Sequence, residues 1–492
     1  MKQPNIVLLL LDAARADHIG AYGYNRDTTQ FLDNLATRGV RYDNVYANSV
    51  FSLPSYASLF TGEYPTSHGA VDWNKRVNNN RFVSELNEAG YETTAVTTHL
   101  VTGEFGLADA FDIHETVAIT PNDRLFDDDP VGERMSKRGT AQGWSSELEK
   151  YVLFLRTLVR HPSPKSAANG AYALCQKLKR KLGFWEDDGG QAVADRCKQV
   201  IRETDEPFFL FGNFVETHDP YRPPRSVRSK FLPDDATLDE VREAVEYSSV
   251  RASVGLEEMD DRRTEILKAL YDAELTYVDE LIEQIYTELE QQGMAKSTVF
   301  VVLSDHGDFF GEQGLWGHQG GVYDEVSRVP LIVKYPWETE EPSDGPYELR
   351  GLTDHLLSLA DGSRELLDDP GEALVEYYGI DTQLSFTPWE EYESIDADEW
   401  GQYQCGYADE NYRLIWDSDG ETELYERADS GATTDVSAEK PSVVAEFKTR
   451  VRGLVGNPKD NHHQYRARED DSREFEMTED VEDRLRQLGY TE

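Results

Sequence analysis

The chain has 492 residues, enough for one large domain with a smaller companion, and its 94 acidic residues against 49 basic ones give a net charge of −45. This balance argues against nucleic acid, or an anionic membrane, as the main partner. Self-repulsion of this size is tolerable where salt screens it, at a Debye length of about 3 Å in 1 M salt, so we expect a halophilic source, an archaeon.

The cysteines and the hydropathy of the chain argue against a disulfide-rich protein and against a membrane protein. Cys175, Cys197 and Cys405 are odd in number and widely spaced, which predicts free thiols rather than a disulfide framework or a zinc site. The apolar run Ile6 to Leu11 ends at Asp12, too soon for a signal peptide or a membrane span. We therefore expect a cytoplasmic chain without stable membrane insertion, and the sequence leaves the oligomeric state open.

The N-terminal region begins with a strand and a helix. Asn5 to Leu11 is apolar throughout, which is typical of a strand buried on both faces of a parallel sheet, and it ends at Asp12. A helix is predicted after Thr28 or Thr29 and closes at Gly39. The next strand, 40–47, delivers the chain to a segment rich in serine.

Ser52 lies just before a predicted short helix. Pro54 suits the first turn of that helix, and Gly62 ends it. Free N–H groups and the helix dipole favour negative charge at such a place, so an anionic ligand is expected near Ser52. A helix over 81–89 and a strand over 91–97 follow, and the strand ends near His99.

The stretch from about 121 to 202 is helical and charged, without strand signals, and predicts an insertion over one side of the sheet. Its basic residues stand out in an acidic chain: Arg156, Arg160, Lys165, Lys177, Lys179, Arg180 and Lys181. A basic patch could contact an anionic substrate or partner. A solvated helix face that balances local acids is the favoured interpretation.

The second half repeats the alternation of strands and helices. Strands are predicted over 207–215, 299–303 and 329–335, and helices over 257–293 and 353–359. After about residue 368, short aromatic-rich segments predict a small antiparallel sheet with one helix near 443–455. The predicted fold is α/β, with a large, mostly parallel central sheet flanked by helices. Its main domain covers 1–367, an α+β subdomain 368–456 and a charged helical tail 457–492.

Strand ends carry the candidate chemistry. Asp12 follows the first strand, and Asp305 with His306 follows the strand 299–303. Because the carboxyl ends of parallel strands meet at one edge of a sheet, these side chains are expected near Ser52. Two carboxylates, an imidazole and a hydroxyl would hold one divalent cation, Mg²⁺, Ca²⁺, Mn²⁺ or Zn²⁺, and His306 favours the last two. Such an ion would polarise an anionic ester and activate Ser52 as a nucleophile.

Three further histidines follow a predicted strand or lie in a glycine-rich loop. His99, His218 and His318 could bind the outer oxygens of the ester or protonate its leaving group. Taken singly, each is more often a surface or structural histidine.

Seven segments resemble, in order, the sulfatase branch of the alkaline phosphatase superfamily. They are NIVLLLLDAARADHIGAYGY, TTQFLDNLATRGVRYDNVYANS, SLPSYASLFTGEYP with SHG, ETHDPY, YVDELIEQIYTELEQQG, SDHGDFFGEQGLWGHQGG with YDEVSRVPLIVKYP, and DGETELYERADS. The resemblance implies an α/β sandwich with a smaller C-terminal sheet domain, and a main domain that is catalytic. It also implies one divalent metal and chemistry at a sulfate or phosphate ester.

The resemblance assigns roles by position. Metal contacts match four residues, Asp12, Ser52, Asp305 and His306. Ser52 also occupies the nucleophile position of a C/S-x-P-x-R motif, and three histidines match or fall near residues that contact the ester or leaving group: His218, His318 and, more loosely, His99.

Two departures from the family pattern matter. Ala13 follows Asp12, where the family usually has a second acid, so one ligand is missing or supplied differently. Tyr56 replaces the arginine that belongs to the signal for formylglycine formation, which argues against conversion of Ser52. An unmodified serine suits phosphoryl or phosphonyl chemistry.

The sequence thus predicts a metal-dependent hydrolase of sulfate esters, borne by small molecules, glycans or lipids. The alternatives are a phosphoesterase, phosphonate esterase or phosphotransferase that uses unmodified Ser52, and a pseudoenzyme that binds anions without turnover.

Overall fold

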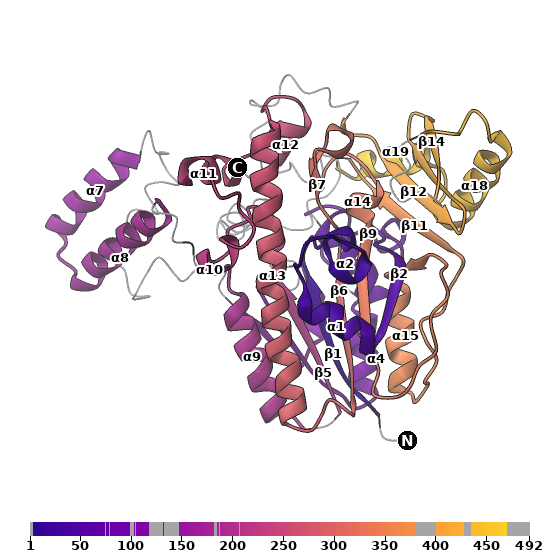
Figure 1. Cartoon of the computed structure of the whole chain (residues 1–492), viewed down its shortest axis with the longest axis horizontal. Coiled ribbons are helices and arrows are strands. Elements are labelled where there is room, and N and C mark those ends of the chain that lie inside the picture. Colours follow the sequence, from indigo (N-terminus) through magenta and orange to yellow (C-terminus); the bar gives the residue numbers. More distant parts are fainter. Residues whose placement is uncertain are drawn as a thin grey trace.

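A computed structural model describes residues 3–98 except 74 and 78, 103–117 except 104, 131, 147–181, 185, 187–379 except 206, 400–427 and 434–469. These residues build a body around an eight-stranded sheet, with a four-stranded sheet at one end and a pair of helices projecting at the other side (Figure 1).

The central sheet has the strand order β10-β2-β9-β6-β1-β5-β3-β4. Its strands are β1 (Asn5–Leu11), β2 (Val40–Tyr46), β3 (Glu92–Thr97), β4 (Ile113–Thr116), β5 (Phe208–Phe214), β6 (Thr298–Ser304), β9 (Arg328–Lys334) and β10 (Tyr347–Glu348). β9 runs antiparallel to both of its neighbours, β6 and β2, whereas all other pairings are parallel. The predicted mostly parallel α/β fold is confirmed.

The centre of this sheet is buried on both faces. Every residue of β1, β5 and β6 is buried, and β1 pairs in parallel with the other two. Alternate side chains of β1 enter two separate cores, with Ile6 and Leu8 on one side and Val7 and Leu9 on the other. Helices must therefore cover both faces, which is why these strands read as continuous apolar runs.

Two sets of helices provide that cover. One core contains residues of α2 (Ser52–Thr61), α4 (Arg81–Glu88) and α15 (Gly351–Ala360), and the other contains residues of α1 (Gln30–Arg38), α9 (Gly190–Glu203), α11 (Leu238–Val245) and α13 (Asp261–Gln291). Shorter elements join them: α3 (Pro65–His68), α10 (Arg225–Arg228), α12 (Ser249–Ser253), α14 (Asp324–Ser327), β7 (Phe309–Phe310) and β8 (Trp316–Gly317).

The predicted helical insertion over 121–202 is described in part. Residues 118–130 and 132–146 lie outside the described residues. α7 (Glu147–Arg160) and α8 (Pro164–Lys181) project from the body (Figure 1), while α9 packs with β5 and α13 in the core. The three cysteines are free thiols, with Cys197 and Cys405 buried and Cys175 exposed.

The C-terminal sheet is antiparallel, as predicted. It consists of β11 (Glu372–Tyr377), β12 (Gln404–Asp409), β13 (Tyr412–Asp417) and β14 (Thr422–Glu426), and α18 (Pro441–Leu454) and α19 (Pro458–Glu469) contribute to its core. This sheet also supports the segment before Ser52. Glu376 N donates to Asn48 O (2.9 Å), and Ser49 Oγ donates to Glu376 O (2.8 Å).

Candidate active site

The rim formed by the carboxyl ends of β1, β5 and β6 gathers the predicted side chains. Ser52 Oγ lies 3.1 Å from His306 Nε2. The same nitrogen is 3.7 Å from an oxygen of Asp12 and 3.6 Å from Asp305 Oδ2. All four residues are fully buried. Residues from the first and the sixth strand and from α2 thus meet at one point, as the strand-end argument predicts.

The turn after β1 is bound directly to the end of β6. Ala13 adopts a left-handed conformation (φ 60°). Its N–H donates to Asp305 Oδ1 (3.2 Å), and the His306 N–H donates to the same oxygen (3.1 Å). Asp305 Oδ2 is buried and has no hydrogen-bond partner among the described residues. The carboxylate of Asp305 is therefore held by one oxygen and directs the other at the centre of the site.

Ser52 is the first residue of α2 rather than the residue before it. The helix is fixed beside the rim because Ser55 Oγ donates to Asp305 O (2.7 Å). Tyr56, which stands in place of the motif arginine, is fully buried, and its hydroxyl accepts from Asn213 Nδ2 of β5 (2.7 Å). Tyr56 thus serves as an anchor between α2 and the sheet.

His306 presents a lone pair to the centre. Its Nδ1 lies 3.0 Å from Gly307 O, and because a carbonyl only accepts, Nδ1 carries the proton. Nε2 is then an acceptor, and the Ser52 hydroxyl donates to it. Burial lowers the pKa of His306 to about 3, so the imidazole is neutral. A neutral imidazole is the form that binds a metal ion.

The residues present fit a divalent cation. Asp12, Asp305 and His306 offer ligand atoms that all lie within 4.8 Å of one another. Burial raises the pKa of Asp12 well above its ordinary value, and the nearby carboxylates of Asp305 and Asp308 raise it further. Buried carboxylates so close together are costly unless a positive charge pairs with them, so this donor set matches an ion such as Mn²⁺ or Zn²⁺.

Two more predicted histidines lie beside His306. The ring centroids of His306 and His318 are 4.6 Å apart, those of His218 and His318 are 5.1 Å apart, and those of His218 and His306 are 6.2 Å apart. His218 Nδ1 donates to Asp219 O (2.6 Å), which fixes its tautomer. Burial, with a contribution from His218, lowers the pKa of His318 to about 3. His99, the remaining predicted histidine, lies outside the described residues.

Asp308 is a site residue that the sequence interpretation missed. Its Oδ1 lies 3.1 Å from His318 Nδ1, and its Oδ2 accepts from Tyr221. Arg15 Nη1 donates to its carbonyl (2.9 Å), and burial raises the pKa of the Asp308 carboxyl to about 6. The sequence signal was only an acid two residues after His306, in a turn where aspartate is common.

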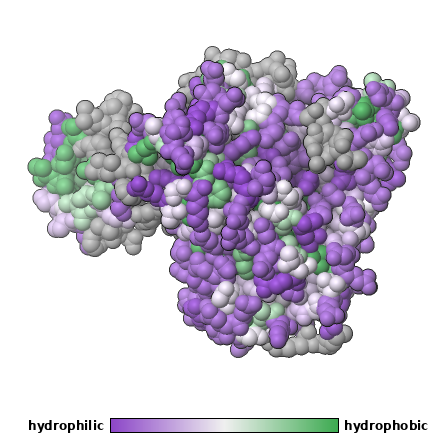
Figure 2. Space-filling view, viewed as in Figure 1, coloured by the Kyte–Doolittle hydropathy of each residue, from purple (hydrophilic) through white to green (hydrophobic). Residues whose placement is uncertain are grey.

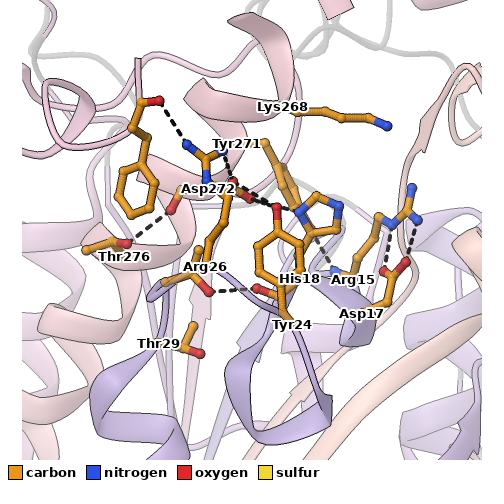
Figure 3. A network of polar contacts seen from close by, with 12 residues as sticks. Arg15, Asp17, His18, Tyr24, Arg26, Thr29, Lys268, Tyr271, Asp272 and Thr276 are labelled. Carbon is orange, nitrogen blue, oxygen red and sulfur yellow. Dashed lines mark hydrogen bonds and ion pairs between the residues drawn. The ribbon is translucent and has the colours of Figure 1, made fainter. Parts of the chain in front are cut away.

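A second polar network fixes the turn that carries Asp12. Tyr271 on α13 donates to Ala13 O (3.0 Å) and accepts from Arg15 N (2.7 Å). Next to it on the same helix, Asp272 binds three side chains of the following segment, His18, Tyr24 and Arg26 (Figure 3). α13 therefore holds the chain after β1 from the side opposite α2.

Comparison with known proteins identifies a family and shared folds. A family model described as Sulfatase matches residues 4–363. An arylsulfatase of Clostridium perfringens is 25% identical over 382 residues, which cover 74% of this chain and 74% of that protein. An N-acetylglucosamine-6-O-sulfatase of Bacteroides thetaiotaomicron is 24% identical over 373 residues, covering 68% of this chain and 63% of that protein. The crystal structure of a phosphonate monoester hydrolase of Agrobacterium radiobacter shares the fold with a TM-score of 0.59 and 16% identity, covering 92% of this chain and 95% of that one.

Proposed function

Because the chain belongs to the sulfatase family, we propose that it hydrolyses sulfate monoesters with Ser52 as the nucleophile. One observation carries this proposal. The Ser52 hydroxyl contacts His306 Nε2 at 3.1 Å, at the point where the carboxylates of Asp12 and Asp305 converge. Ser52 is the first residue of α2, so the start of this helix holds the hydroxyl against His306.

Members of this family generally use a divalent metal ion, and we propose that Asp12, Asp305, His306 and Ser52 hold it here. When bound, the ion would lower the pKa of the serine hydroxyl and offset the charge on the ester oxygens. The donor set of carboxylates, one hydroxyl and one imidazole favours Mn²⁺ or Zn²⁺ over Mg²⁺ or Ca²⁺.

Residues of this chain supply the nucleophile and the proton for the leaving group. Ser52 Oγ loses its proton to a water molecule and forms a bond to sulfur while the bond between sulfur and the ester oxygen breaks. The departing oxygen takes a proton from His318 or His218, whose rings lie beside His306, the contact of Ser52. Burial keeps His318 neutral by lowering its pKa to about 3, and the negative charge of a bound ester would favour its protonated form. Water then attacks the sulfur, one of its protons restores the Ser52 hydroxyl, the other returns to the histidine, and sulfate is released.

A second candidate is hydrolysis of phosphonate or phosphate monoesters by the same serine. The observation in its favour is Tyr56, which replaces the arginine of the formylglycine signal and anchors α2. If Ser52 keeps its hydroxyl, attack on phosphorus is a natural use for it. The phosphonate monoester hydrolase of the same fold supports this candidate.

One experiment separates the two candidates. Peptide mass spectrometry at position 52 is combined with assays of 4-nitrophenyl sulfate and phenyl phosphonate monoesters on the same metal-loaded sample. Sulfate turnover with an intact serine would support the sulfatase as proposed and rule out the phosphonate candidate as the main activity, whereas sulfate turnover with formylglycine at position 52 would keep the sulfatase but not the serine nucleophile. An intact serine with phosphonate turnover would do the reverse. No turnover of any ester would favour an anion-binding pseudoenzyme.

We also infer that the protein is adapted to high salt, because its net charge of −45 destabilises the compact state unless ions screen it. Dialysis into low salt is expected to lower both the unfolding temperature and the activity. Full stability and activity without added salt would contradict the inference.

A further inference from the structure

The helices α7 and α8 form a hairpin that projects from the side of the molecule (Figure 1). Three residues, 161–163, connect them, and Phe154 of α7 packs directly on Gly170 of α8. A β-carbon at Gly170 would lie 2.5 Å from the Phe154 ring, so glycine is required for this contact. The two helices are thus closely packed against each other.

The hairpin exposes several large apolar side chains and buries two polar ones. Val159 is 80% exposed, Leu155 59% and Leu174 47%, whereas Ser166 and Asn169 are buried. Four of the seven large apolar side chains that are exposed among the described residues lie on this hairpin, the fourth being Val152. Green atoms gather at its outer end in Figure 2. Apolar side chains of this kind, gathered on one element, mark an interaction surface.

These apolar side chains follow the period of the helix. Val152, Leu155 and Val159 are spaced by three and four residues, which places them on one face of α7. Arg156 and Arg160 directly follow Leu155 and Val159 and are exposed with them. We call the surface formed by Val152, Leu155, Arg156, Val159, Arg160 and Leu174 the docking face.

The charge of the hairpin is reversed relative to the rest of the chain. Positions 147 to 181 hold eight basic and two acidic residues, a net charge of +6, within a chain of −45. The acidic balance of the whole chain argues against anionic partners, but this argument does not hold locally. A projecting, positively charged segment is attracted to anionic surfaces that the remaining surface repels.

We propose that the docking face binds the surface of an anionic lipid bilayer. Leu155, Val159 and Leu174 would enter the boundary between headgroups and acyl chains, and the two arginines would lie against lipid phosphates. Among the described residues, no helix is long and apolar enough to cross a membrane, so the contact is peripheral. This proposal does not depend on which ester the active site hydrolyses.

A bilayer fits this surface better than a second copy of the chain. Protruding aliphatic side chains on a convex helix need no complementary pocket in a fluid membrane. A two-fold dimer would pair the docking face with its own copy and bring two hairpins of net charge +6 together, and their like charges repel. An acidic partner protein would attract the arginines but leave the aliphatic side chains in water.

Vesicle flotation tests the proposal with the full chain, at a fixed salt concentration at which the protein is folded and active. The vesicles are pure phosphatidylcholine, or three parts phosphatidylcholine to one part phosphatidylglycerol. The wild type is expected to float more with the anionic vesicles than with the neutral ones, because arginine–phosphate contacts act within the short Debye length of concentrated salt. The variant Leu155→Ser/Val159→Ser/Leu174→Ser should weaken binding at least about tenfold, and Arg156→Gln/Arg160→Gln several-fold.

Matched controls change exposed residues of the same types elsewhere. Leu238→Ser/Leu256→Ser alters two exposed leucines, and Lys230→Gln/Arg450→Gln alters two exposed cations. Both are expected to bind like the wild type. Every variant is checked by circular dichroism and by turnover of a soluble ester, which should not change because the docking face is separate from the rim. Val159→Ser alone, at an 80% exposed position, serves if the triple variant misfolds.

Two results would overturn the proposal. The first is failure of the folded wild type to bind the anionic vesicles, or equal binding by the aliphatic variants. The second is dimerisation in sedimentation equilibrium that these variants abolish, without vesicle binding by the wild type, which would make the face an interface between copies.

Discussion

The rim of the central sheet and the docking face depart from the ordinary distribution of polar and apolar groups in opposite directions. At the rim, Asp12, Asp305 and His306 are fully buried, and at the docking face, Leu155 and Val159 are mostly exposed. Buried charge is costly unless an opposite charge pairs with it, and exposed apolar surface is costly unless something covers it. The rim is thus built for a small charged ligand, and the docking face for a broad apolar one.

The largest expected effect is a loss of turnover that leaves the docking face unaffected. Ser52→Ala removes the proposed nucleophile, so kcat/KM should fall by about a thousandfold or more, while vesicle binding stays unchanged. Steady-state kinetics and flotation on one preparation measure both quantities. Ser84→Ala, an exposed serine on α4, is the control and should retain both. Wild-type turnover by Ser52→Ala would make the assignment of the nucleophile wrong.

Removal of metal probes the buried charge at the rim. A chelator should abolish turnover and lower the unfolding temperature, because Asp12 and Asp305 then repel each other without a cation. A ligand present at a hundred times its Kd stabilises the folded state by about 2.7 kcal/mol, which sets the scale of the expected shift.

Differential scanning fluorimetry with and without chelator measures this shift, and added Mn²⁺ or Zn²⁺ should reverse it. In Asp305→Asn the unfolding temperature should no longer respond to the chelator. An unfolding temperature of the wild type that is indifferent to both chelator and metal would contradict a cation at this rim.

The sequence was informative where burial determines residue type. β1, β5 and β6 are buried on both faces, so they read as unbroken apolar runs, and the acids after β1 and β6, Asp12 and Asp305, were predicted to form a site. The meeting of Asp12 with Asp305 followed from parallel pairing alone. The antiparallel direction of β9 could not be predicted from the sequence, because β9 is a buried apolar strand whichever way it runs.

Relations between side chains were less predictable. The pairing of Asp308 with His318 depends on how the loop after β6 folds back, which residue type does not encode. Tyr56 was read only as a missing arginine, although it binds Asn213 across α2 and β5. On α7 the apolar residues recur at helical spacing. Such spacing shows that they share one face of the helix, but it does not show whether that face is buried in the core or exposed to solvent.

A smaller effect on activity is expected from Asp308, which positions His318 rather than touching the ester. Asp308→Asn should lower kcat by about ten- to a hundredfold, because the His318 ring loses the charged acceptor at Nδ1. The loss should be larger for esters with poor leaving groups, which need a proton, than for 4-nitrophenyl esters.

This dependence on the leaving group separates a positioning role from a purely structural one. A uniform loss across leaving groups, or a change in KM alone, would mean that His318 does not protonate the departing oxygen. Asp308→Glu should restore part of kcat, because it returns a carboxylate to the same ring.

The smallest effect on activity concerns Glu216, a buried carboxylate beside the rim that lies outside the proposed cation site. Its carboxylate lies against the first turn of α9, where a β-carbon at Gly190 would be 2.3 Å from Oε1. Burial raises the pKa of Glu216 from 4.5 to about 8, with smaller contributions from Asp188 and Asp187. The folded protein therefore binds more protons than the unfolded chain between these values, so stability falls as the pH rises through this window.

Glu216→Gln removes this titration without changing the shape of the side chain. Relative to the wild type, the variant should become more stable toward about pH 9, by at most about 5 kcal/mol, and kcat should not change. Denaturant unfolding at several pH values measures the difference, and Glu290→Gln at an exposed position of α13 is the control. If the two variants followed the same pH dependence, the buried carboxylate would carry no penalty, and the cost assigned to unpaired charge beside the rim would have to be revised.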